Sequence, residues 1–176
     1  MEFCRYEKTG HVVRITITRP EGMNALHPPA GRELQQAWDE FANDDDAWVA
    51  VLTGEGDKAF SAGNDLKYTA EISRLPREQR PDLSWPAGGF GGVTHRFDLF
   101  KPTIARVNGF ALGGGLEMAL WCDIIVAAEH AELGLPEPRR GLIAGALGVH
   151  RLPRQLHLKQ AMGYLLTGRH IPARRA

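Results

Sequence analysis

Apolar and β-branched residues gather in short segments along the chain, and the pattern within each segment predicts a strand. Alternation of apolar and polar residues predicts a first strand over 11–18. Apolar runs predict buried strands at 48–53 and 123–127. Residues 103–107 are predicted to form a further strand between them. A shorter apolar segment, 131–135, is a candidate for one more.

Helical spacing of apolar residues begins after the first of these strands. Pro28 and Pro29 open a helix that runs to about Asn43, with one apolar face formed by Leu34, Ala37, Trp38 and Phe41. Further helices are predicted at 65–72, 113–121, 145–151 and 158–166. Strands that alternate with helices predict an α/β fold with a largely parallel sheet. We see no internal domain boundary, so residues 1–176 are expected to form a single domain.

The segment 76–92 interrupts this alternation. It contains Pro76, Pro81, Pro86 and four glycines, residues that break regular structure. It is therefore predicted to be the least ordered stretch and the best candidate for a mobile flap. Trp85 and Phe90 within it are candidates for contact with a ligand, although anchoring of the loop is the simpler interpretation.

Charge and composition exclude several classes of protein. Lys plus Arg and Asp plus Glu each total 21, and a nucleic-acid binder usually has a basic excess. No apolar run approaches the ~20 residues of a membrane span, and the N-terminus has no signal-peptide core, so a cytoplasmic location is expected. Cys4 and Cys122 lack the spacing of a metal site and are expected to be free thiols, with no metal bound.

Three glycines, Gly113–Gly115, precede the predicted helix that carries Glu117. Glycine allows unusual φ angles and the close approach of a ligand to the backbone. The start of a helix offers unpaired N–H donors and a positive dipole end, which suit an anion or a carbonyl oxygen that becomes one. The alternative is tight packing of helix on sheet with no ligand.

Two glutamates are candidates for acid–base chemistry. The helix around Glu117 is apolar on nearly all sides, so this carboxyl group is expected to be buried and its pKa raised. Glu137 lies between Pro136 and Pro138, which form a rigid mount. The simpler alternatives are a first-turn glutamate that stabilises the helix dipole and an exposed turn residue. Only the fold can bring the two side chains together.

A loop of small residues, 59–67, follows a predicted buried strand and precedes a helix. It is placed to supply backbone N–H groups to a ligand. Lys67 at its end is a candidate phosphate contact, although a solvated surface charge is the simpler interpretation.

Taken together, these segments resemble the crotonase superfamily, the enoyl-CoA hydratase/isomerase family. The resemblance covers essentially the whole chain in the family's order. The matching stretches are 17–26, 59–66, 101–115, 122–125, 133–137 and 152–168. It implies a crotonase-like spiral of packed sheets built from repeated ββα turns.

The resemblance also implies roles for individual residues. The backbone N–H groups of Asn64 and Gly114 match the oxyanion hole that holds the thioester carbonyl. Glu117 and Glu137 match the two glutamates that flank the attacking water, with Glu117 assigned here as base and Glu137 as acid. The implied coenzyme A contacts are Ala25, Ala62, Asn64, Asp65, Leu66, Lys67, Gly113 and Gly114.

The implied activity is reversible addition of water to the double bond of an α,β-unsaturated acyl-CoA. The presence of two glutamates favours hydration or dehydration over isomerisation, because isomerases and many other members of the family keep only one acidic residue at these positions. A specialised dehydratase, such as one acting on carnitinyl-CoA, is an alternative. An alternative from another class is a catalytically silent CoA-binding or assembly subunit. No cofactor is implied, because coenzyme A is part of the substrate.

The chain differs from the family's usual pattern in two ways. The family continues beyond the point that corresponds to Ala176, into helices that cap the acyl pocket and form trimers. We therefore expect the C-terminal trimerisation region to be missing, although a homo-oligomer (a trimer or a dimer of trimers) is the implied assembly. Arg139, Arg140 and Leu147 stand where smaller or apolar residues are common, which affects substrate choice.

Overall fold

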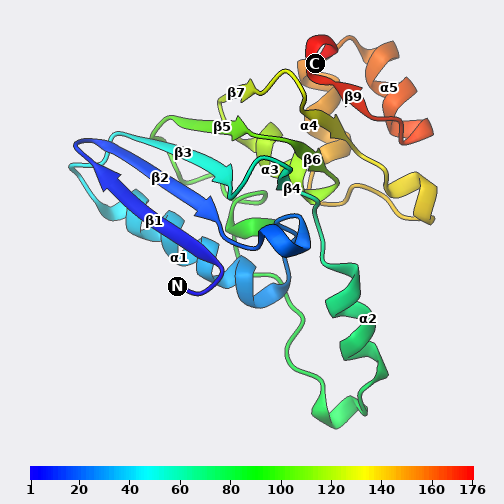
Figure 1. Cartoon of the computed structure of the whole chain (residues 1–176), viewed down its shortest axis with the longest axis horizontal. Coiled ribbons are helices and arrows are strands. Elements are labelled where there is room, and N and C mark those ends of the chain that lie inside the picture. The colour runs from blue at the N-terminus through cyan, green and yellow to red at the C-terminus, as the bar shows by residue number, and fades with distance from the viewer.

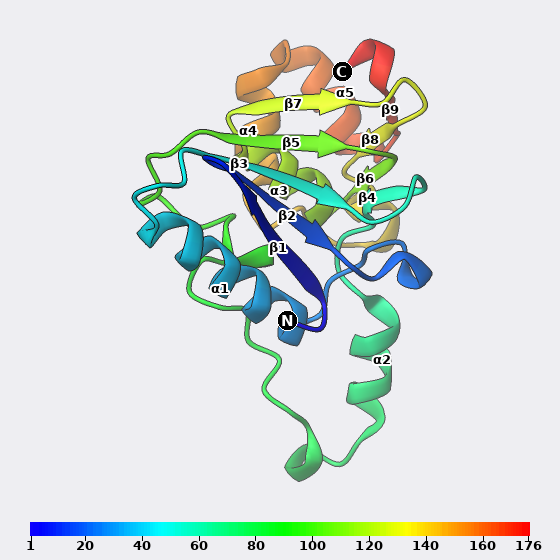
Figure 2. The same cartoon turned by 60° about the vertical axis from the view of Figure 1, so that its left-hand side comes forward.

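Two β-sheets form the framework of the computed structural model, which describes residues 1–176 (Figures 1 and 2). The five-stranded sheet has the order β1–β2–β3–β5–β7. Its first two strands are antiparallel, and all its other neighbours are parallel. Its strands are β1 (Cys4–Thr9), β2 (Val12–Ile17), β3 (Val49–Gly54), β5 (Thr103–Val107) and β7 (Ile124–Ala127).

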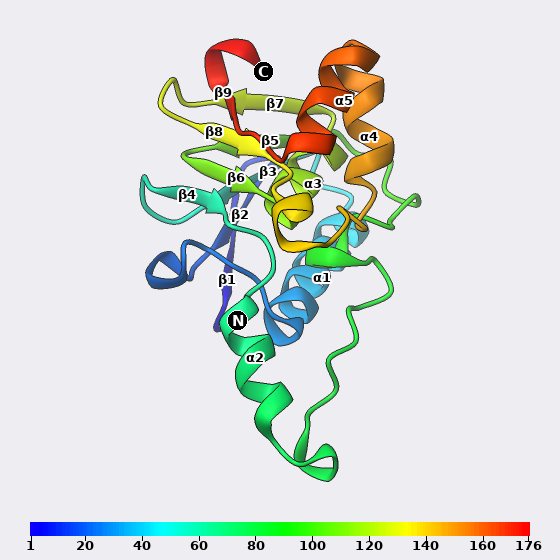
Figure 3. The ribbon, with the colours of Figure 1, turned by 90° about the vertical axis from the view of Figure 1, so that its right-hand side faces the viewer.

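The second sheet has four short strands in the order β4–β6–β8–β9, stacked beside the helices in Figure 3. Only the last pair is antiparallel. Its strands are β4 (Ala59–Ser61), β6 (Phe110–Leu112), β8 (Glu132–Gly134) and β9 (Ile171–Pro172).

The chain builds both sheets by repeating one unit. Each unit adds a strand to the five-stranded sheet, then a strand to the four-stranded sheet, then a helix. The units are β3–β4–α2 (Leu66–Arg74), β5–β6–α3 (Gly114–Trp121) and β7–β8–α4 (Gly148–Gln155). This confirms the α/β class and the spiral of ββα turns that the resemblance implied.

Helix α1 (Pro28–Asn43) covers one face of the five-stranded sheet (Figure 2). His27 caps its start, since its Nδ1 accepts a hydrogen bond from Ala30 N at 3.1 Å. The predicted apolar face, Leu34, Ala37, Trp38 and Phe41, is fully buried. None of the chain's helices has both the length and the apolar character needed to cross a bilayer.

Helix α3 is the most deeply buried helix, since seven of its eight residues are buried. It contacts β4, β5, β6 and α4. The remaining helix, α5 (Leu158–Thr167), packs on α4 and is followed by β9. Helix α2, by contrast, projects from the body and buries none of its residues (Figures 1 and 3).

The predicted flap, 76–92, has two different halves. Its first half stays exposed and holds one 3-10 turn, η2 (Arg77–Gln79). Its second half ends in another turn, η3 (Phe90–Gly92), which is buried and packs against α1. The expectation of least order is therefore wrong for the second half, because Phe90 belongs to the core.

Other expectations also need correction. Strands β1, β4, β6 and β9 were not predicted, because β1 is rich in charge and the others are too short to show alternation. Strand β7 was expected to be buried, yet Ile124 and Val126 are exposed because β7 is an edge strand with an uncovered outer face. Helix α4 begins later than predicted, after Leu147, whose φ of 75° is not helical.

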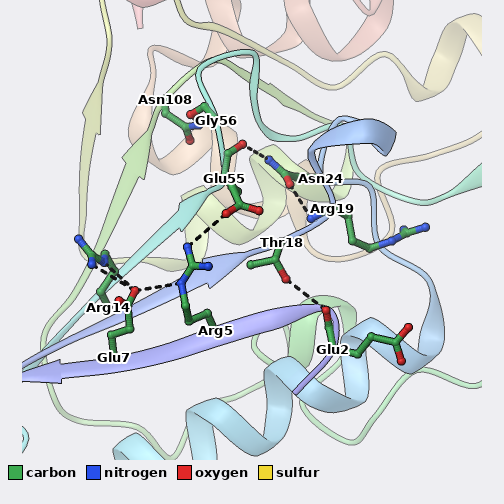
Figure 4. A network of polar contacts seen from close by, with 10 residues as sticks. All are labelled: Glu2, Arg5, Glu7, Arg14, Thr18, Arg19, Asn24, Glu55, Gly56 and Asn108. Carbon is green, nitrogen blue, oxygen red and sulfur yellow. Dashed lines mark hydrogen bonds and ion pairs between the residues drawn. The ribbon is translucent and has the colours of Figure 1, made fainter.

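Two buried asparagines hold the turn between the sheets in place (Figure 4). Asn24 Nδ2 donates to Glu55 O at 3.0 Å and to Ala59 O at 2.7 Å. Asn108 Oδ1 accepts from Gly54 N at 3.2 Å, while its Nδ2 donates to Gly56 O at 2.8 Å. These bonds satisfy the backbone between β3 and β4 and so set the position of the loop that follows β4.

Asn108→Ala is expected to lower the free energy of unfolding by about 2–3 kcal/mol, because Gly54 N–H and Gly56 C=O lose their partner. Urea unfolding monitored by circular dichroism measures the change. The control is Asn43→Ala, which removes one exposed bond and should change stability by less than about 0.5 kcal/mol. Equal losses in the two variants would contradict this role for Asn108.

Candidate active site

A cleft of about 710 Å³ opens beside the N-terminus of α3. Its walls come from segments far apart in the sequence: the loop after β4, the second half of the 76–92 segment, the start of α3, and the segment from Pro136 to Ala146. Both predicted glutamates and both predicted oxyanion-hole residues line it. The fold therefore brings together the residues that the sequence left apart.

The three glycines at the start of α3 are required by close contacts. Gly113 has a φ of +55°, which residues with a side chain rarely adopt. A Cβ on Gly114 would lie 2.5 Å from the ring of Phe90, and one on Gly115 would lie 2.1 Å from Ser61 O. The helix start is thus pressed against η3 on one side and β4 on the other. Because Gly114 is the first helical residue, its N–H has no acceptor within the helix.

The loop after β4 lies against this helix start. Gly63 has a φ of +85°, and a Cβ there would lie 2.9 Å from Gly114 N. The amide of Asp65 donates to Leu26 O at 2.8 Å, whereas that of Asn64 has no protein acceptor. Two unpaired amides, those of Asn64 and Gly114, therefore meet the same cleft from neighbouring segments.

Glu117 is almost completely buried, with 3% of its surface exposed. Its Oε1 accepts a hydrogen bond from Gly148 N, at the start of α4, at 2.8 Å. A Cβ on Gly148 would lie 2.8 Å from this oxygen, so the contact requires glycine. Burial raises the pKa of Glu117 to about 7, the nearby charge of Glu137 adds to the rise, and the Gly148 amide opposes it.

Glu137 begins the 3-10 turn η4 (Glu137–Arg140) and is half-buried. Its Oε1 lies 2.9 Å from the position that a Cβ on Gly113 would occupy. Its Oε2 is buried and has no hydrogen-bond partner. Burial raises the pKa of this carboxyl group as well. An unpaired buried oxygen calls for an explanation, and a ligand that binds it in the cleft is one.

The two carboxyl groups share one cleft, and each is more easily protonated than an ordinary glutamate. Groups that interact in this way titrate as a pair. One protonated and one ionised carboxyl group near neutral pH can donate and accept a proton in the same reaction. The simpler interpretations of both residues, a dipole partner and an exposed turn residue, do not explain this burial.

The predicted coenzyme A contacts divide into two groups. Ala62, Asn64, Leu66, Gly113 and Gly114 line the cleft, whereas Ala25, Asp65 and Lys67 do not. Asp65 caps α2 by accepting from Tyr68 N at 3.0 Å, and it pairs with Arg19 at 2.9 Å. Its side chain is therefore committed to structure. Lys67 is exposed and has no polar partner in the structure.

Several cleft residues were missed or given a structural role by sequence reasoning. Gly63 and Gly148 position the unpaired amides and Glu117, but single glycines in loops carry no distinguishing signal. Trp85 and Phe90, for which loop anchoring was the simpler interpretation, line the cleft with ring centroids 4.5 Å apart, and His95 lines it too. His170 also lines the cleft, and its position after α5 gave no indication of this. No cluster of three His, Cys, Asp or Glu side chains forms a metal-binding group.

A spiral of ββα turns whose cleft holds two carboxyl groups beside two unpaired backbone amides defines a crotonase-type protein. The chain belongs to the enoyl-CoA hydratase/isomerase family, whose model matches residues 7–176. It is 41% identical over 175 residues to the carnitinyl-CoA dehydratase of Salmonella arizonae. That alignment covers 99% of this chain and 64% of the relative, so the chain spans about two thirds of the length of such relatives.

Solved structures agree with this assignment. The structure of a carnitinyl-CoA dehydratase from Mycobacterium avium has 45% sequence identity and a TM-score of 0.89. The match covers 99% of this chain and 66% of that one. An enoyl-CoA hydratase from Mycobacterium tuberculosis has 40% identity and a TM-score of 0.88, with 99% and 65% covered. The likeness therefore extends over the cleft-forming elements described here.

Burial of Glu117 predicts a specific dependence of stability on pH. The folded chain keeps this proton up to a pH of about 7, whereas the unfolded chain loses it near 4.5, so the folded state binds more protons between these values. The free energy of unfolding should therefore fall as pH rises through this range, by up to about 3 kcal/mol. Glu117→Gln keeps an oxygen that can accept the hydrogen bond from the Gly148 amide but removes the titrating group. Its free energy of unfolding should therefore not fall in this way.

The variant should be more stable than the wild type at pH 8 and similar to it near pH 4.5. Urea unfolding across this range measures the difference. Glu129→Gln, at a side chain that is 86% exposed, is the matched control and should leave the pH profile unchanged. A stability difference between Glu117→Gln and wild type that stays constant with pH would contradict the buried protonation.

Proposed function

We propose that the protein catalyses the reversible addition of water to the double bond of an α,β-unsaturated acyl-CoA. The observation that carries the proposal is the meeting of two raised-pKa carboxyl groups and two unpaired amides in one cleft. Family membership supports the same chemistry. The amides of Asn64 and Gly114 bind the thioester oxygen and stabilise the negative charge that develops on it.

The glutamates supply the proton transfers. Glu117, as carboxylate, takes a proton from water while the water oxygen bonds to the β-carbon of the substrate. The electron pair of the double bond moves toward the thioester carbonyl, and Glu137, as carboxylic acid, gives its proton to the α-carbon. The reverse sequence removes water from a 3-hydroxyacyl-CoA. The reaction needs no cofactor, because coenzyme A belongs to the substrate.

Dehydration of a specialised hydroxyacyl-CoA is a second candidate, and the names of the carnitinyl-CoA dehydratases among the relatives favour it. Isomerisation is less well supported, because it needs one acid and the cleft holds two. A silent CoA-binding subunit is also less well supported, since removing two carboxyl groups from water, one of them with an unpartnered oxygen, lowers stability for no gain if they are not used.

Self-association is a further part of the proposal. Phe97 and Phe100, on the segment before β5, are 74% and 92% exposed. Large apolar side chains that are this exposed are favourable positions for protein–protein contact. We infer a homo-oligomer of the kind that the resemblance implied.

Glu117→Gln and Glu137→Gln should each lower kcat for hydration of crotonyl-CoA by roughly 10²–10⁴-fold, because each removes one proton transfer. Loss of the enoyl-thioester absorbance measures turnover, and calorimetry with butyryl-CoA checks that binding persists. Glu129→Gln is the exposed control. Full activity in both cleft variants would overturn the mechanism, and a wild type that binds without turnover would establish the silent subunit.

Gly63→Ala tests the pair of amides. The added methyl group would meet Gly114 N at 2.9 Å and Leu112 O at 2.7 Å, so the two segments must move apart. Disturbing one donor should lower kcat by about 10²–10³-fold. Gly10 also has a positive φ, at +57°, but has open space around it, so Gly10→Ala should introduce backbone strain and keep activity. Equal activity in the two variants would contradict the role of these amides.

A further inference from the structure

Two arginines of η4 line the cleft but have no role in the proposed reaction. Arg140 is exposed and forms no hydrogen bond or ion pair through its side chain. Arg139 is partly held, because its Nε donates to Thr167 O at 3.2 Å. Most other cleft-lining groups are apolar, glycine or already assigned. The free guanidinium of Arg140 is therefore the main unexplained group in the cleft.

The 3-10 geometry of η4 places Arg140 relative to the reaction. Side chains at positions i and i+3 of a 3-10 turn project in the same direction, so Arg140 lies on the same side of η4 as Glu137. The thioester carbonyl belongs at Asn64 and Gly114, and the reacting carbons belong beside the glutamates. Because Arg140 lines the same cleft as Glu137, an acyl chain that passes the glutamates can reach its guanidinium.

The charge balance of the cleft favours an anion near Arg140. The ionisable residues of the lining are Glu117, Glu137, His95, Arg139, Arg140 and His170. Burial favours the neutral form of both glutamates, whereas arginine stays charged. At least one carboxyl group must also hold a proton for the reaction. The cleft thus carries more positive than negative charge, and the excess lies at η4.

We propose that Arg140, assisted by Arg139, selects an enoyl-CoA whose acyl chain ends in a carboxylate. This inference rests on the proposed hydratase function and names its substrate class. A guanidinium binds a carboxylate through two parallel hydrogen bonds, which gives both affinity and orientation. Leu142 and Ile143 line the cleft just after Arg140 and supply apolar contact for the intervening methylene groups.

A cationic acyl end is the main competing interpretation, because Trp85 and Phe90 also line the cleft and aromatic rings attract cations. Both rings, however, are used in packing. A Cβ on Gly31 would lie 2.7 Å from Trp85, and one on Gly114 would lie 2.5 Å from Phe90. Two arginines would also repel a quaternary ammonium group. The arrangement therefore favours the anion.

The test compares three enoyl-CoA substrates of similar length, whose acyl chains end in a methyl group, a carboxylate or a trimethylammonium group. We expect the wild type to have its highest kcat/KM with the carboxylate. Arg140→Gln should lower kcat/KM for that substrate by roughly 10–100-fold, and the ratio of carboxylate to methyl substrate should fall by a similar factor. Arg174→Gln removes an exposed arginine that does not line the cleft, and it should keep the ratio.

Calorimetry with the saturated analogues glutaryl-CoA and butyryl-CoA separates this inference from the proposed function. If the wild type binds glutaryl-CoA more tightly than butyryl-CoA and Arg140→Gln abolishes this difference, the inference is supported. This holds even if no substrate turns over, in which case only the hydratase proposal fails. Three results overturn the inference: equal kcat/KM for the three substrates, preference for the cation, or an Arg140→Gln loss that is equal for all acyl groups and for free coenzyme A. The last result would assign Arg140 to a phosphate.

Discussion

The close contact between the start of α3 and the loop after β4 is the constraint on which the rest of the structure depends. Side chains at Gly114 and Gly115 would overlap Phe90 and Ser61, and one at Gly63 would press on Gly114 N. Glycine at these positions lets two backbones from different ββα turns meet. Their contact leaves two amides without protein partners, and the asparagine bonds to the turn before β4 keep that loop in place.

Burial of the two glutamates is the second consequence of this packing. Helix α3 is enclosed by both sheets, η3 and α4, so Glu117 leaves water when the chain folds. One hydrogen bond from Gly148 offsets only part of the lost hydration, which is why the pKa rises. The chain thus tolerates a locally unfavourable carboxyl group, as proteins do at sites where proton transfer requires it.

Much of the framework was predictable because it depends on local pattern. Strands β2, β3, β5 and β7 and all five α-helices were visible in the sequence pattern, and the proline pair at the start of α1 marked its first turn. Strands β4, β6 and β9 were not predictable in this way, since two or three residues are too few for an alternating pattern. Their formation depends on neighbours from the previous turn of the spiral.

The sequence by itself determined the family, the glycine-rich start of α3 and the two glutamates as candidates, because these depend on residue type and order. Only the tertiary structure decided that Glu117 and Glu137 line one cleft, that Asp65 is committed to capping α2 while Asn64 faces the cleft, and that Phe90 and Arg140 form part of its wall. These outcomes depend on contacts between distant segments and on exclusion of water, which exist only once the turns of the spiral have packed.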